Sequence, residues 1–549
     1  MLETTFTTEF APGTNLPGGV SGANWAFLLP RLELERIVCF GPPADPALAR
    51  LARIAEDVVV VCSGRSQLHR AEGAARRLGG GGIRACSRSA ARSLEDGSAD
   101  LVVAEGRRAD VAELRRLVKP GGLVYSSPAI VSRLELGGSS TRAAYALAVA
   151  PRRGEVQNAT PAEDRELLDY MLDHPAYCPS FRRGVLRRAH RAASRRQILS
   201  PLTRRESSFA GAGDAALPAY LREIAASAGI DLDGRRFGLS ARGRFSSRKV
   251  LFLVFDAAGE TLEYIVKITR EPDLNGRLEN EHRALTLLEL SGVRDLDTLP
   301  RAAFFGYHGG LAVLGETVVD GRPFELPRES PSDSPALRAA VDWLVELGAV
   351  TAPVVDPQEV SARLERLLAR FVEVYRPGEA TAGFLAAQIE TIAQSRSPFS
   401  LAFQHGDPHT GNVLVTPAGR VVFLDWEAAE SQGMPLWDLF HFMRGCANLA
   451  TRGARGRDAL AGFRRFYLAD SELGRLLCDA TRTLCEHTGL AGELVEPLLY
   501  TCWMHRALKE ATRLPAERLG EGRFLSLLRL CIAEREAPGL IRLFSAGKA

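Results

Sequence analysis

The stretch FQHGDPHTGNVLV (residues 403–415) places four polar side chains between two apolar runs: His405, Asp407, His409 and Asn412. The apolar runs, Ser400–Phe403 and Val413–Val415, are typical of short strands. We therefore expect the polar residues on a tight connection that is held by buried strands. Loops placed in this way frequently carry function.

The residues that follow, NVLVTPAGRVVFLDWE, predict a hairpin around the turn signal TPAG. If Val415 pairs with Arg420, then Asn412 lies opposite Phe423, and Asp425 follows two residues later. Diagonal neighbours in a hairpin lie roughly 7–8 Å apart. A hard cation with oxygen ligands at about 2.0–2.1 Å then fits between the Asn412 amide oxygen and the Asp425 carboxylate. The hairpin thus predicts a metal site.

Asp407 lies five residues before Asn412, on the loop that enters the hairpin. A carboxylate beside a metal-bound phosphate can orient an attacking hydroxyl and take its proton. We therefore expect Asp407 to be a catalytic base. We expect His409 to be an ordinary loop histidine, because no third ligand with zinc-site spacing follows His405 and His409.

Together these segments resemble the aminoglycoside phosphotransferase and choline kinase family. The resemblance rests on His405-Gly406-Asp407, on Asn412 and on Asp425-Trp426-Glu427. The family shares the protein-kinase fold, in which H-R-D-x-x-x-x-N and D-F-G have the same roles. Glycine in place of the arginine, and Trp-Glu in place of Phe-Gly, distinguish the small-molecule kinases.

The resemblance implies transfer of the γ-phosphate of ATP, or of another nucleoside triphosphate, to a hydroxyl of a small molecule. It places Mg²⁺ on Asn412 and Asp425 and makes Asp407 the residue that orients the hydroxyl. Asp438 matches a family aspartate that holds the catalytic loop.

A phosphotransferase also needs a cation on the nucleotide phosphates and a carboxylate that holds this cation. The strand YIVKI resembles the V-A-I-K strand of kinases and has Lys267 at its centre, and only five of the 69 cationic residues are lysines. In the next helix we expect Glu281 to pair with Lys267, because Glu281 lies on the packed stripe with Leu285. Glu279 is the alternative. It faces another side, since two residues turn a helix by about 200°.

The loop that covers the phosphates is expected within residues 239–249. It lacks G-x-G-x-x-G, and the candidates for nucleotide contacts there are Gly243, Ser246 and Ser247. Leu311–Val318 is expected to be the last strand of this lobe and to lead into the hinge beside an adenine ring. Glu316, near its end, is a further candidate for nucleotide binding.

From about residue 34 to 150, short apolar runs alternate with helical stretches, which is typical of a doubly wound parallel sheet. The segment VKPGGLVY (118–125) resembles the entry to the fifth strand of class I methyltransferases. The first loop, FGPPAD, has two prolines where such folds use glycines to bring backbone N–H groups to a cofactor. The loop CSGR after the second strand lacks a ribose-binding acid. We expect a degenerate, non-catalytic domain, and a working methyltransferase is the alternative.

The expected fold class is α/β plus α+β, a Rossmann-like doubly wound domain followed by a two-lobed protein-kinase-like domain. The predicted boundaries are 1–155 for the Rossmann-like domain, 156–212 for a basic helical linker, 213–325 for the kinase-like N-lobe and 326–549 for the helical C-lobe. An apolar stripe recurs every four residues on the Arg-covered linker: Phe181, Val185, Ala189 and Ala193. We expect a solvated helix there, and a surface for phosphate or acidic partners is the alternative.

The composition, with 46% hydrophobic and 25% charged residues, is that of a globular protein. The formal net charge of +3 does not favour nucleic acid or an anionic membrane as a partner. Nine scattered cysteines without CxxC indicate a reducing compartment. The first residues lack the basic and apolar regions of a signal peptide, so we expect none, and the apolar runs are far too short for a membrane span. We expect a cytoplasmic protein, with a protein partner at the N-terminal domain or linker as a further hypothesis.

The acceptor stays open among aminoglycosides, other amino sugars, sugars and amino alcohols. Its contacts are expected in the helical lobe after Asp438, although helix-period Leu and Trp residues there are more often core. Two rival functions also stay open, a nucleotide-binding pseudokinase or scaffold and a kinase-fold enzyme that transfers AMP. The catalytic positions are all filled, which argues against a scaffold: Lys267, Asp407, Asn412 and Asp425.

Overall fold

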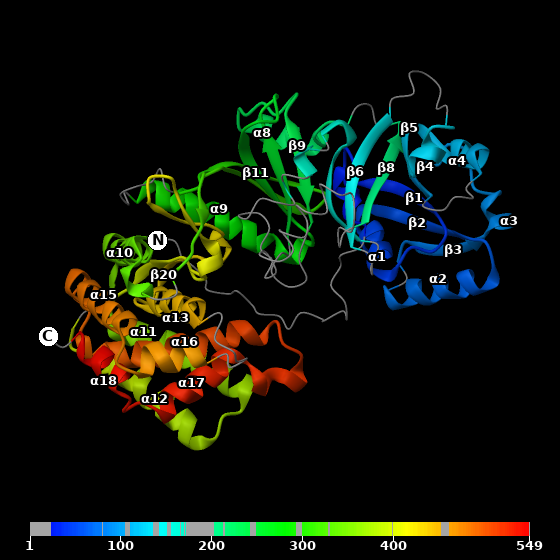
Figure 1. Cartoon of the computed structure of the whole chain (residues 1–549). Helices are drawn as coiled ribbons and strands as arrows, with labels where there is room; N and C mark the ends of the chain where they lie inside the picture. Colours follow the sequence, from blue (N-terminus) through cyan, green and yellow to red (C-terminus); the bar gives the residue numbers. More distant parts are fainter. Residues whose placement is uncertain are drawn as a thin grey trace. The chain divides into compact units, whose positions relative to one another are not determined.

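The structure of the chain is a computed structural model (Figure 1). It describes residues 23–547 except 80, 105–109, 135–141, 151–154, 165, 169–170, 172–202, 212–214, 242–248, 292–298, 328–329, 398 and 452–459. The chain divides into two compact units. We call residues 23–279 and 302–318 the sheet unit, and residues 280–301 and 319–547 the helical unit.

In the described residues, one mixed sheet of 13 strands organises the sheet unit, in the order β12-β13-β11-β10-β9-β7-β6-β8-β5-β4-β1-β2-β3. The last five strands in this order are parallel to one another. They are β1 (Leu34–Phe40), β2 (Ala55–Cys62), β3 (Ile83–Ser87), β4 (Ala99–Ala104) and β5 (Val118–Ser126). The helices beside them are α1 (Asp45–Ile54), α2 (Arg65–Arg77), α3 (Arg88–Ala91), α4 (Val111–Leu117) and α5 (Pro128–Val131).

Alternate residues of the parallel strands face two separate cores. Ile37 of β1 packs in one core with Leu48 of α1. Val38, the next residue, packs in the other core with Leu114 of α4. Both faces of this part of the sheet are therefore covered, which explains the unbroken apolar runs of its strands.

The apolar runs Val58–Cys62 and Leu123–Ser126 predict two of the strands of this region. β2 and β5 end where these runs end, but β2 begins earlier, at Ala55, and β5 begins earlier, at Val118. The added residues are polar or conformationally special, such as Asp57 and Pro120, so hydrophobicity does not mark them. Asp57 is instead held by ion pairs from neighbouring strands.

Antiparallel strands continue the same sheet: β6 (Arg142–Ala150), β7 (Glu155–Pro161), β8 (Thr203–Ala210) and β9 (Arg236–Ser240). β7 and β8 are the two ends of the predicted linker 156–212, so the prediction of a helical segment is wrong at both ends. Backbone pairing decides these ends, β7 with the preceding strand β6 and with β9, and β8 with β5 and β6, and local periodicity does not report such pairing. The predicted apolar stripe from Phe181 to Ala193 lies outside the described residues.

The remaining antiparallel strands include the one that was predicted to carry the nucleotide lysine. They are β10 (Lys249–Phe255), β11 (Leu262–Thr269), β12 (Ala302–His308) and β13 (Leu311–Thr317). Lys267 of β11 lies opposite Leu314 of β13. α8 (Ala219–Ser227) belongs to the sheet unit, and the boundary between the units falls within α9 (Asn275–Leu290). Strands from the predicted Rossmann-like domain, linker and N-lobe thus share one sheet.

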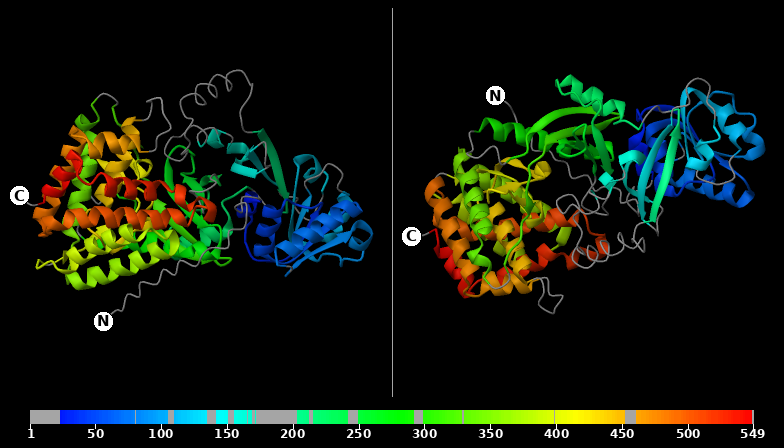
Figure 2. Two further views of the ribbon diagram at one scale, coloured as in Figure 1. Left: turned by 90° about the horizontal axis from the view of Figure 1, so that it is seen from below. Right: turned by 45° about the horizontal axis from the view of Figure 1, so that its top comes forward.

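The helical unit consists mainly of helices (Figure 2). They are α10 (Pro335–Val350), α11 (Pro357–Tyr375), α12 (Glu379–Ala393), α13 (Trp437–Thr451), α14 (Ala461–Phe463), α15 (Glu472–Thr488), α16 (Val495–Ala511), α17 (Arg523–Ala533) and α18 (Pro538–Ser545). Its strands are short: β14 (Arg322–Pro323), β15 (Val354–Val355), β16 (Phe399–Ser400), β17 (Ala402–Gln404), β18 (Val413–Val415), β19 (Val421–Phe423) and β20 (Glu430–Gly433). No described helix of the chain has the length and apolar character needed to cross a membrane.

β18 and β19 form the predicted hairpin, but the predicted register is wrong by one residue. Val415 pairs with Val421 and Val413 with Phe423. The register shifts because Thr416 still pairs with Arg420, so the turn is the three-residue loop 417–419, with Gly419 at a φ of 80°. A three-residue hairpin loop that ends in a left-handed glycine is a common type. Asn412 therefore lies beside Leu424, one residue closer to Asp425 than predicted.

Candidate active site

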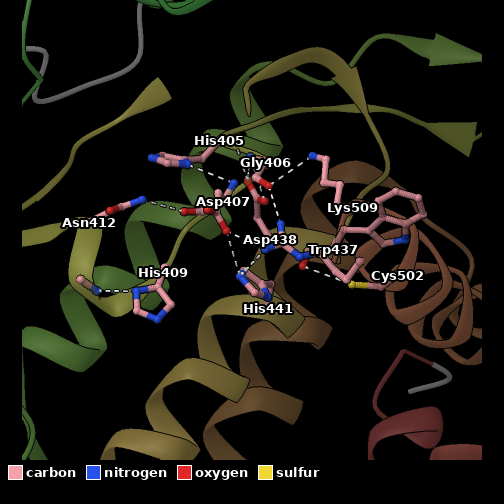
Figure 3. A network of polar contacts seen from close by, with 12 residues as sticks. His405, Gly406, Asp407, His409, Asn412, Trp437, Asp438, His441, Cys502 and Lys509 are labelled. Carbon is pink, nitrogen blue, oxygen red and sulfur yellow. Dashed lines mark hydrogen bonds and ion pairs between the residues drawn. The ribbon is translucent and has the colours of Figure 1, made fainter. Parts of the chain in front are cut away.

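The loop that carries Asp407 connects β17 to β18 through a short 3₁₀ helix, Thr410–Asn412 (Figure 3). Asp438, in the first turn of α13, holds the start of this loop. Its Oδ2 accepts the backbone N–H of His405 at 2.6 Å, and its Oδ1 accepts that of Gly406 at 3.2 Å. Burial raises the pKa of Asp438 to about 7, although the two N–H groups favour its ionised form. The structure thus gives Asp438 the anchoring role that the resemblance implies.

Gly406 explains why the loop has no arginine at this position. Its φ is 74°, which side chains rarely adopt, and a Cβ atom on it would lie 1.9 Å from the carbonyl oxygen of Ala428. The loop therefore passes too close to the segment after Asp425 for any other residue.

His405 is fully buried and joins the loop to the hairpin. Its Nδ1 accepts the N–H of Asp407 at 3.3 Å, and its Nε2 lies 3.0 Å from the carbonyl oxygen of Leu424. These two bonds require a neutral ring with the proton on Nε2, and burial lowers the pKa of His405 accordingly. His405 thus fixes Asp407 relative to the residue that precedes Asp425.

Asp407 is held by two side chains from the helices. Arg506 of α16 donates from Nη2 to Oδ1 of Asp407 at 2.6 Å and from Nη1 to the carbonyl oxygen of Gly406 at 2.7 Å. Nε2 of His441, on α13, lies 3.2 Å from the same Oδ1. Burial opposes ionisation, but Arg506 and His441 hold the pKa of Asp407 well below its usual range. The side chain is still 34% exposed, so Asp407 is an ionised carboxylate that a ligand can reach.

Asn412 and Asp425 supply the oxygen atoms of the predicted metal site. The Asn412 amide donates from Nδ2 to the carbonyl oxygen of Asp407 at 3.2 Å, and its Oδ1 has no hydrogen bond in the described part of the chain. Asp425 has a φ of 72°, a left-handed conformation that Asp and Asn tolerate better than most residues. Such conformations cluster at functional sites. An amide oxygen and a carboxylate are the donors that Mg²⁺ prefers.

Glu281 is fully buried, as its place on the packed stripe predicts. Its Oε1 accepts the backbone N–H of Trp426 at 2.8 Å. Asn280, the preceding residue, donates from Nδ2 to the carbonyl oxygens of Glu427 and Ala429. α9 therefore holds the segment that begins with Asp425.

Lys267 and Glu316 meet within the sheet unit. Lys267 donates from Nζ to Oε1 of Glu316 at 2.6 Å, and both side chains are buried. Glu279, the alternative to Glu281, instead accepts a hydrogen bond from the Tyr307 hydroxyl at 2.8 Å. The predicted pair of Lys267 with Glu281 joins residues of different units and stays a prediction. Gly243, Ser246 and Ser247 lie outside the described residues.

His409 has the ordinary role expected for it. Its Nδ1 accepts the N–H of Gly411 at 2.9 Å and caps the short helix 410–412. Among the described residues there is no cluster of three or more His, Cys, Asp or Glu side chains suited to a metal ion.

Sequence reasoning missed His441, Arg506 and Lys509. Lys509 Nζ lies 3.5 Å from the carbonyl oxygen of Gly406 and 3.9 Å from Glu430. The scarcity of lysines was a usable signal for Lys509, whereas nothing local marks His441 or Arg506. Trp437 and Trp503, on the other hand, are buried core residues, as helix periodicity favoured.

The sheet unit has a separate hollow at the carboxyl ends of β2 and β3. Its volume is about 280 Å³, and its lining residues are Cys62, Ser63, Gly64, Arg65, Leu68, Ser87, Arg88 and Ser89. Ligands of open parallel sheets bind at this edge.

Residues 241–477 match the APH family, described as the phosphotransferase enzyme family. This part of the chain carries a phosphotransferase-family domain. The matched residues include the loop that carries Asp407, the hairpin, Lys267 and Glu281. No curated protein matches the chain.

Solved structures similar to the chain include small-molecule kinases. An aminoglycoside phosphotransferase from Streptomyces rimosus is 17% identical over 54% of this chain and 98% of its own, with a TM-score of 0.33. An ethanolamine kinase from Plasmodium vivax is 15% identical over 55% of this chain and 83% of its own, with a TM-score of 0.34. A glucosamine kinase is 16% identical over 55% of this chain and 92% of its own, with a TM-score of 0.31. Similarities of this size do not identify a substrate of the phosphotransferase domain.

Proposed function

We propose that the chain is an ATP-dependent phosphotransferase that phosphorylates a hydroxyl group of a small molecule. One observation carries the proposal: inside a phosphotransferase-family domain, an ionised, partly exposed Asp407 is bonded to His405 and Arg506, on a loop whose start is held by Asp438. A scaffold has no need of a carboxylate that is positioned and kept ionised in this way.

In the proposed step, the acceptor hydroxyl oxygen forms a bond to the γ-phosphorus of ATP. The bond from that phosphorus to the β,γ-bridging oxygen breaks, and its electron pair leaves with ADP. Asp407 accepts the hydroxyl proton through the carboxylate oxygen that Arg506 leaves unbound. Because the transition state of such transfers is loose, the proton leaves late, and a carboxylate of low pKa is sufficient to orient the hydroxyl.

Asn412 and Asp425 are proposed to hold Mg²⁺, which their donor atoms fit. When bound, Mg²⁺ neutralises charge on the phosphates. Asn412 is oriented for this task because its Nδ2 is bonded to Asp407, which leaves Oδ1 for the metal. Glu281 and Asn280 hold the segment of Asp425 in place.

Lys267 is proposed to bind the nucleotide phosphates, with Glu281 as its partner, and Glu316 to lie beside the nucleotide. Gly243, Ser246 and Ser247 are proposed to cover the phosphates. The strand order β5-β4-β1-β2-β3, with helices on both faces, supports a Rossmann-like domain at the N-terminal end. Its prolines after β1 support a degenerate, non-catalytic role, and we propose that it meets a protein partner in the cytoplasm.

The test is nucleotide turnover with Mg²⁺ by the full chain and by Asp407→Asn, over a panel of amino sugars, sugars, amino alcohols and their phosphorylated or carboxylated counterparts. Products are identified by mass. Gain of one phosphoryl group by one acceptor class, lost in Asp407→Asn, is the expected result. Gain of an AMP group would replace the proposal by AMP transfer. Nucleotide binding without any acceptor product would favour the pseudokinase.

A further inference from the structure

Arg444 is a buried cation for which the described residues supply no counter-ion. It lies on α13, one turn after His441, and is only 9% exposed. In the part of the chain that the structure describes, its guanidinium makes no hydrogen bond or ion pair, and Nε is sealed from solvent. Burial lowers the pKa of Arg444 to about 10, with Arg506 and Arg523 acting in the same direction and Tyr467 and Asp407 opposing them. The group is still charged at neutral pH, and a buried charge without a counter-ion is costly.

The neighbouring cations each have a carboxylate. The pairs are Arg506 with Asp407 at 2.6 Å, Arg523 with Glu510 at 3.3 Å, and Lys509 with Glu430 at 3.9 Å. The nearby histidines do not supply a negative charge, and burial lowers the pKa of His441 and of His505. Among the described residues, Arg444 is therefore the surplus positive charge of this cluster.

Phe524 of α17 holds this surplus charge close to the catalytic base. The Cζ atom of Arg444 lies 4.7 Å from the centroid of the Phe524 ring, and that of Arg506 lies 5.3 Å from it. The centroid of the His441 ring lies 5.6 Å from the centroid of the Phe524 ring. A cation–π contact stabilises a guanidinium but supplies no counter-charge. Two guanidinium groups thus share one aromatic ring, and one of them contacts Asp407.

We propose that Arg444, together with Arg506, binds an anionic group of the acceptor, a phosphate or a carboxylate. A guanidinium binds either group through two parallel hydrogen bonds, which would satisfy the unpartnered nitrogens of Arg444. The hydroxyl of the same molecule then reaches Asp407. The assignment to the acceptor rests on the proposed phosphotransferase function, whereas the anion site rests on the contacts of Arg444.

This site selects among the acceptor classes. A hydroxy compound with a phosphate or carboxylate gains a counter-charge from Arg444. A polycationic aminoglycoside instead brings positive groups toward Arg444, Arg506 and Lys509, and like charges in an interface disfavour binding. The acceptor is therefore a sugar phosphate or a hydroxy acid, not a polyamine.

The first experiment measures anion binding without turnover. Inorganic phosphate, and separately acetate, is titrated by calorimetry into the full chain saturated with ADP and Mg²⁺. Arg444→Met keeps an unbranched side chain on Phe524 without the charge, and Arg444→Lys keeps a charge. Arg465→Met is the matched control, because Arg465 also lies over a phenylalanine ring, that of Phe466 at 5.1 Å, but makes no contact with Asp407.

We expect phosphate or acetate to bind the wild type and Arg465→Met with equal affinity. Binding should weaken at least tenfold in Arg444→Met and less in Arg444→Lys. The stronger of the two anions identifies the acceptor group. Equal binding by Arg444→Met and the wild type, or no binding of either anion by the wild type, would overturn the proposal.

The second experiment compares turnover of matched acceptors, each sugar or amino alcohol with its phosphorylated or carboxylated counterpart. We expect the anionic member to be phosphorylated, with a KM raised at least tenfold in Arg444→Met and a smaller change in kcat. Better turnover of the neutral or cationic member would refute the acceptor assignment. If phosphate binding depends on Arg444 but no acceptor gains a phosphoryl group, the phosphotransferase proposal fails and the anion site stands.

Discussion

Glu281 accepts a hydrogen bond from the backbone N–H of Trp426 at 2.8 Å, across 145 residues of the chain. Trp426 directly follows Asp425, so the carboxylate of α9 holds the segment that is proposed to bind Mg²⁺. The bond is buried, and Trp426 itself is fully buried with its Nε1 bonded to the carbonyl oxygen of Phe423. Glu281, which the sequence predicts to be the partner of Lys267, thus also positions the segment of the proposed Mg²⁺ ligand Asp425.

Glu281→Gln and Glu281→Leu separate these two roles. Gln keeps an oxygen acceptor for the Trp426 N–H, so its stability should stay close to that of the wild type. Leu leaves this buried N–H unpaired, which costs about 1–3 kcal/mol. Urea unfolding measures the difference. Both variants should raise the KM for ATP, because both lack the charge proposed to hold Lys267. Equal loss of stability in the two variants would contradict this account.

Asp407→Asn should lower phosphoryl transfer by roughly 10²–10⁴-fold, the usual contribution of a positioned general base. The ATP affinity should change much less, because Asp407 is proposed to meet the hydroxyl and not the nucleotide. The matched control is Asp470→Asn, which removes another carboxylate paired with arginines, Arg475 and Arg542, outside this site. Rate and nucleotide binding are measured on the same preparations, and equal rate losses in the two variants would refute the role of Asp407.

Asp425→Asn should fold as the wild type does, because Asn tolerates the left-handed φ of 72°. It should nevertheless lose Mg²⁺-dependent turnover, since it removes the proposed charged ligand. Asp425→Ala should lose about 1 kcal/mol of stability in addition, because alanine is less tolerant of this conformation. Turnover as a function of Mg²⁺, together with urea unfolding, tests both statements. An unchanged Mg²⁺ dependence in Asp425→Asn would place the metal elsewhere.

Gly406→Ala should destabilise the protein more than Gly419→Ala does. Both glycines have positive φ, 74° and 80°, so both substitutions carry a backbone cost of about 1–2 kcal/mol. Only at Gly406 does the new Cβ meet the carbonyl oxygen of Ala428, whereas nothing lies within 4 Å at Gly419. The difference in unfolding free energy between the two variants measures this close approach. Equal values would show that the loop can move away from Ala428.

The stability of the protein should depend on pH through Asp438. Its pKa is about 7 in the folded chain and 3.8 when unperturbed, so the folded state keeps a proton that the unfolded chain releases. The stabilisation that this proton contributes to the folded state is complete below pH 3.8 and is lost as the pH rises to about 7. Asp438→Asn cannot titrate, so the wild type should lose stability relative to this variant over that range. A constant difference between the two would contradict the raised pKa.

Within the hairpin the sequence predicted the right residues but the wrong register. Thr416-Pro417-Ala418-Gly419 marks a turn, yet the turn signal does not say whether Val415 or Thr416 pairs with Arg420. The structure pairs Thr416 with Arg420, because the left-handed Gly419 closes a three-residue loop. The proposed metal site does not depend on this error, since Asn412 and Asp425 stay at the same end of the hairpin.

The strand boundaries show a second limit. Apolar runs located the ends of β1, β2, β4, β5 and β6, which lie in the core. The polar first residues of these strands, such as Glu56 and Asp57 of β2, were not predicted, because hydrophobicity does not mark polar residues that pair at the end of a strand. The ends of the predicted linker, now β7 and β8, were not predicted as strands, because backbone pairing defines them: β7 pairs with β6 and β9, and β8 pairs with β5 and β6.

The sequence by itself determined which residues are proposed to carry the chemistry. Asp407, Asn412 and Asp425 lie within 20 residues of one another, and over this distance the chain's covalent geometry and one hairpin set their relation. Only the tertiary structure decided what surrounds Asp407. Arg506 lies 99 residues from it and Phe524 lies further along the chain, on separate helices whose packing depends on non-directional burial of apolar surface. No local pattern encodes such contacts. For this reason Arg444, which has no counter-ion among the described residues, and the anionic acceptor proposed for it emerge only from the folded chain.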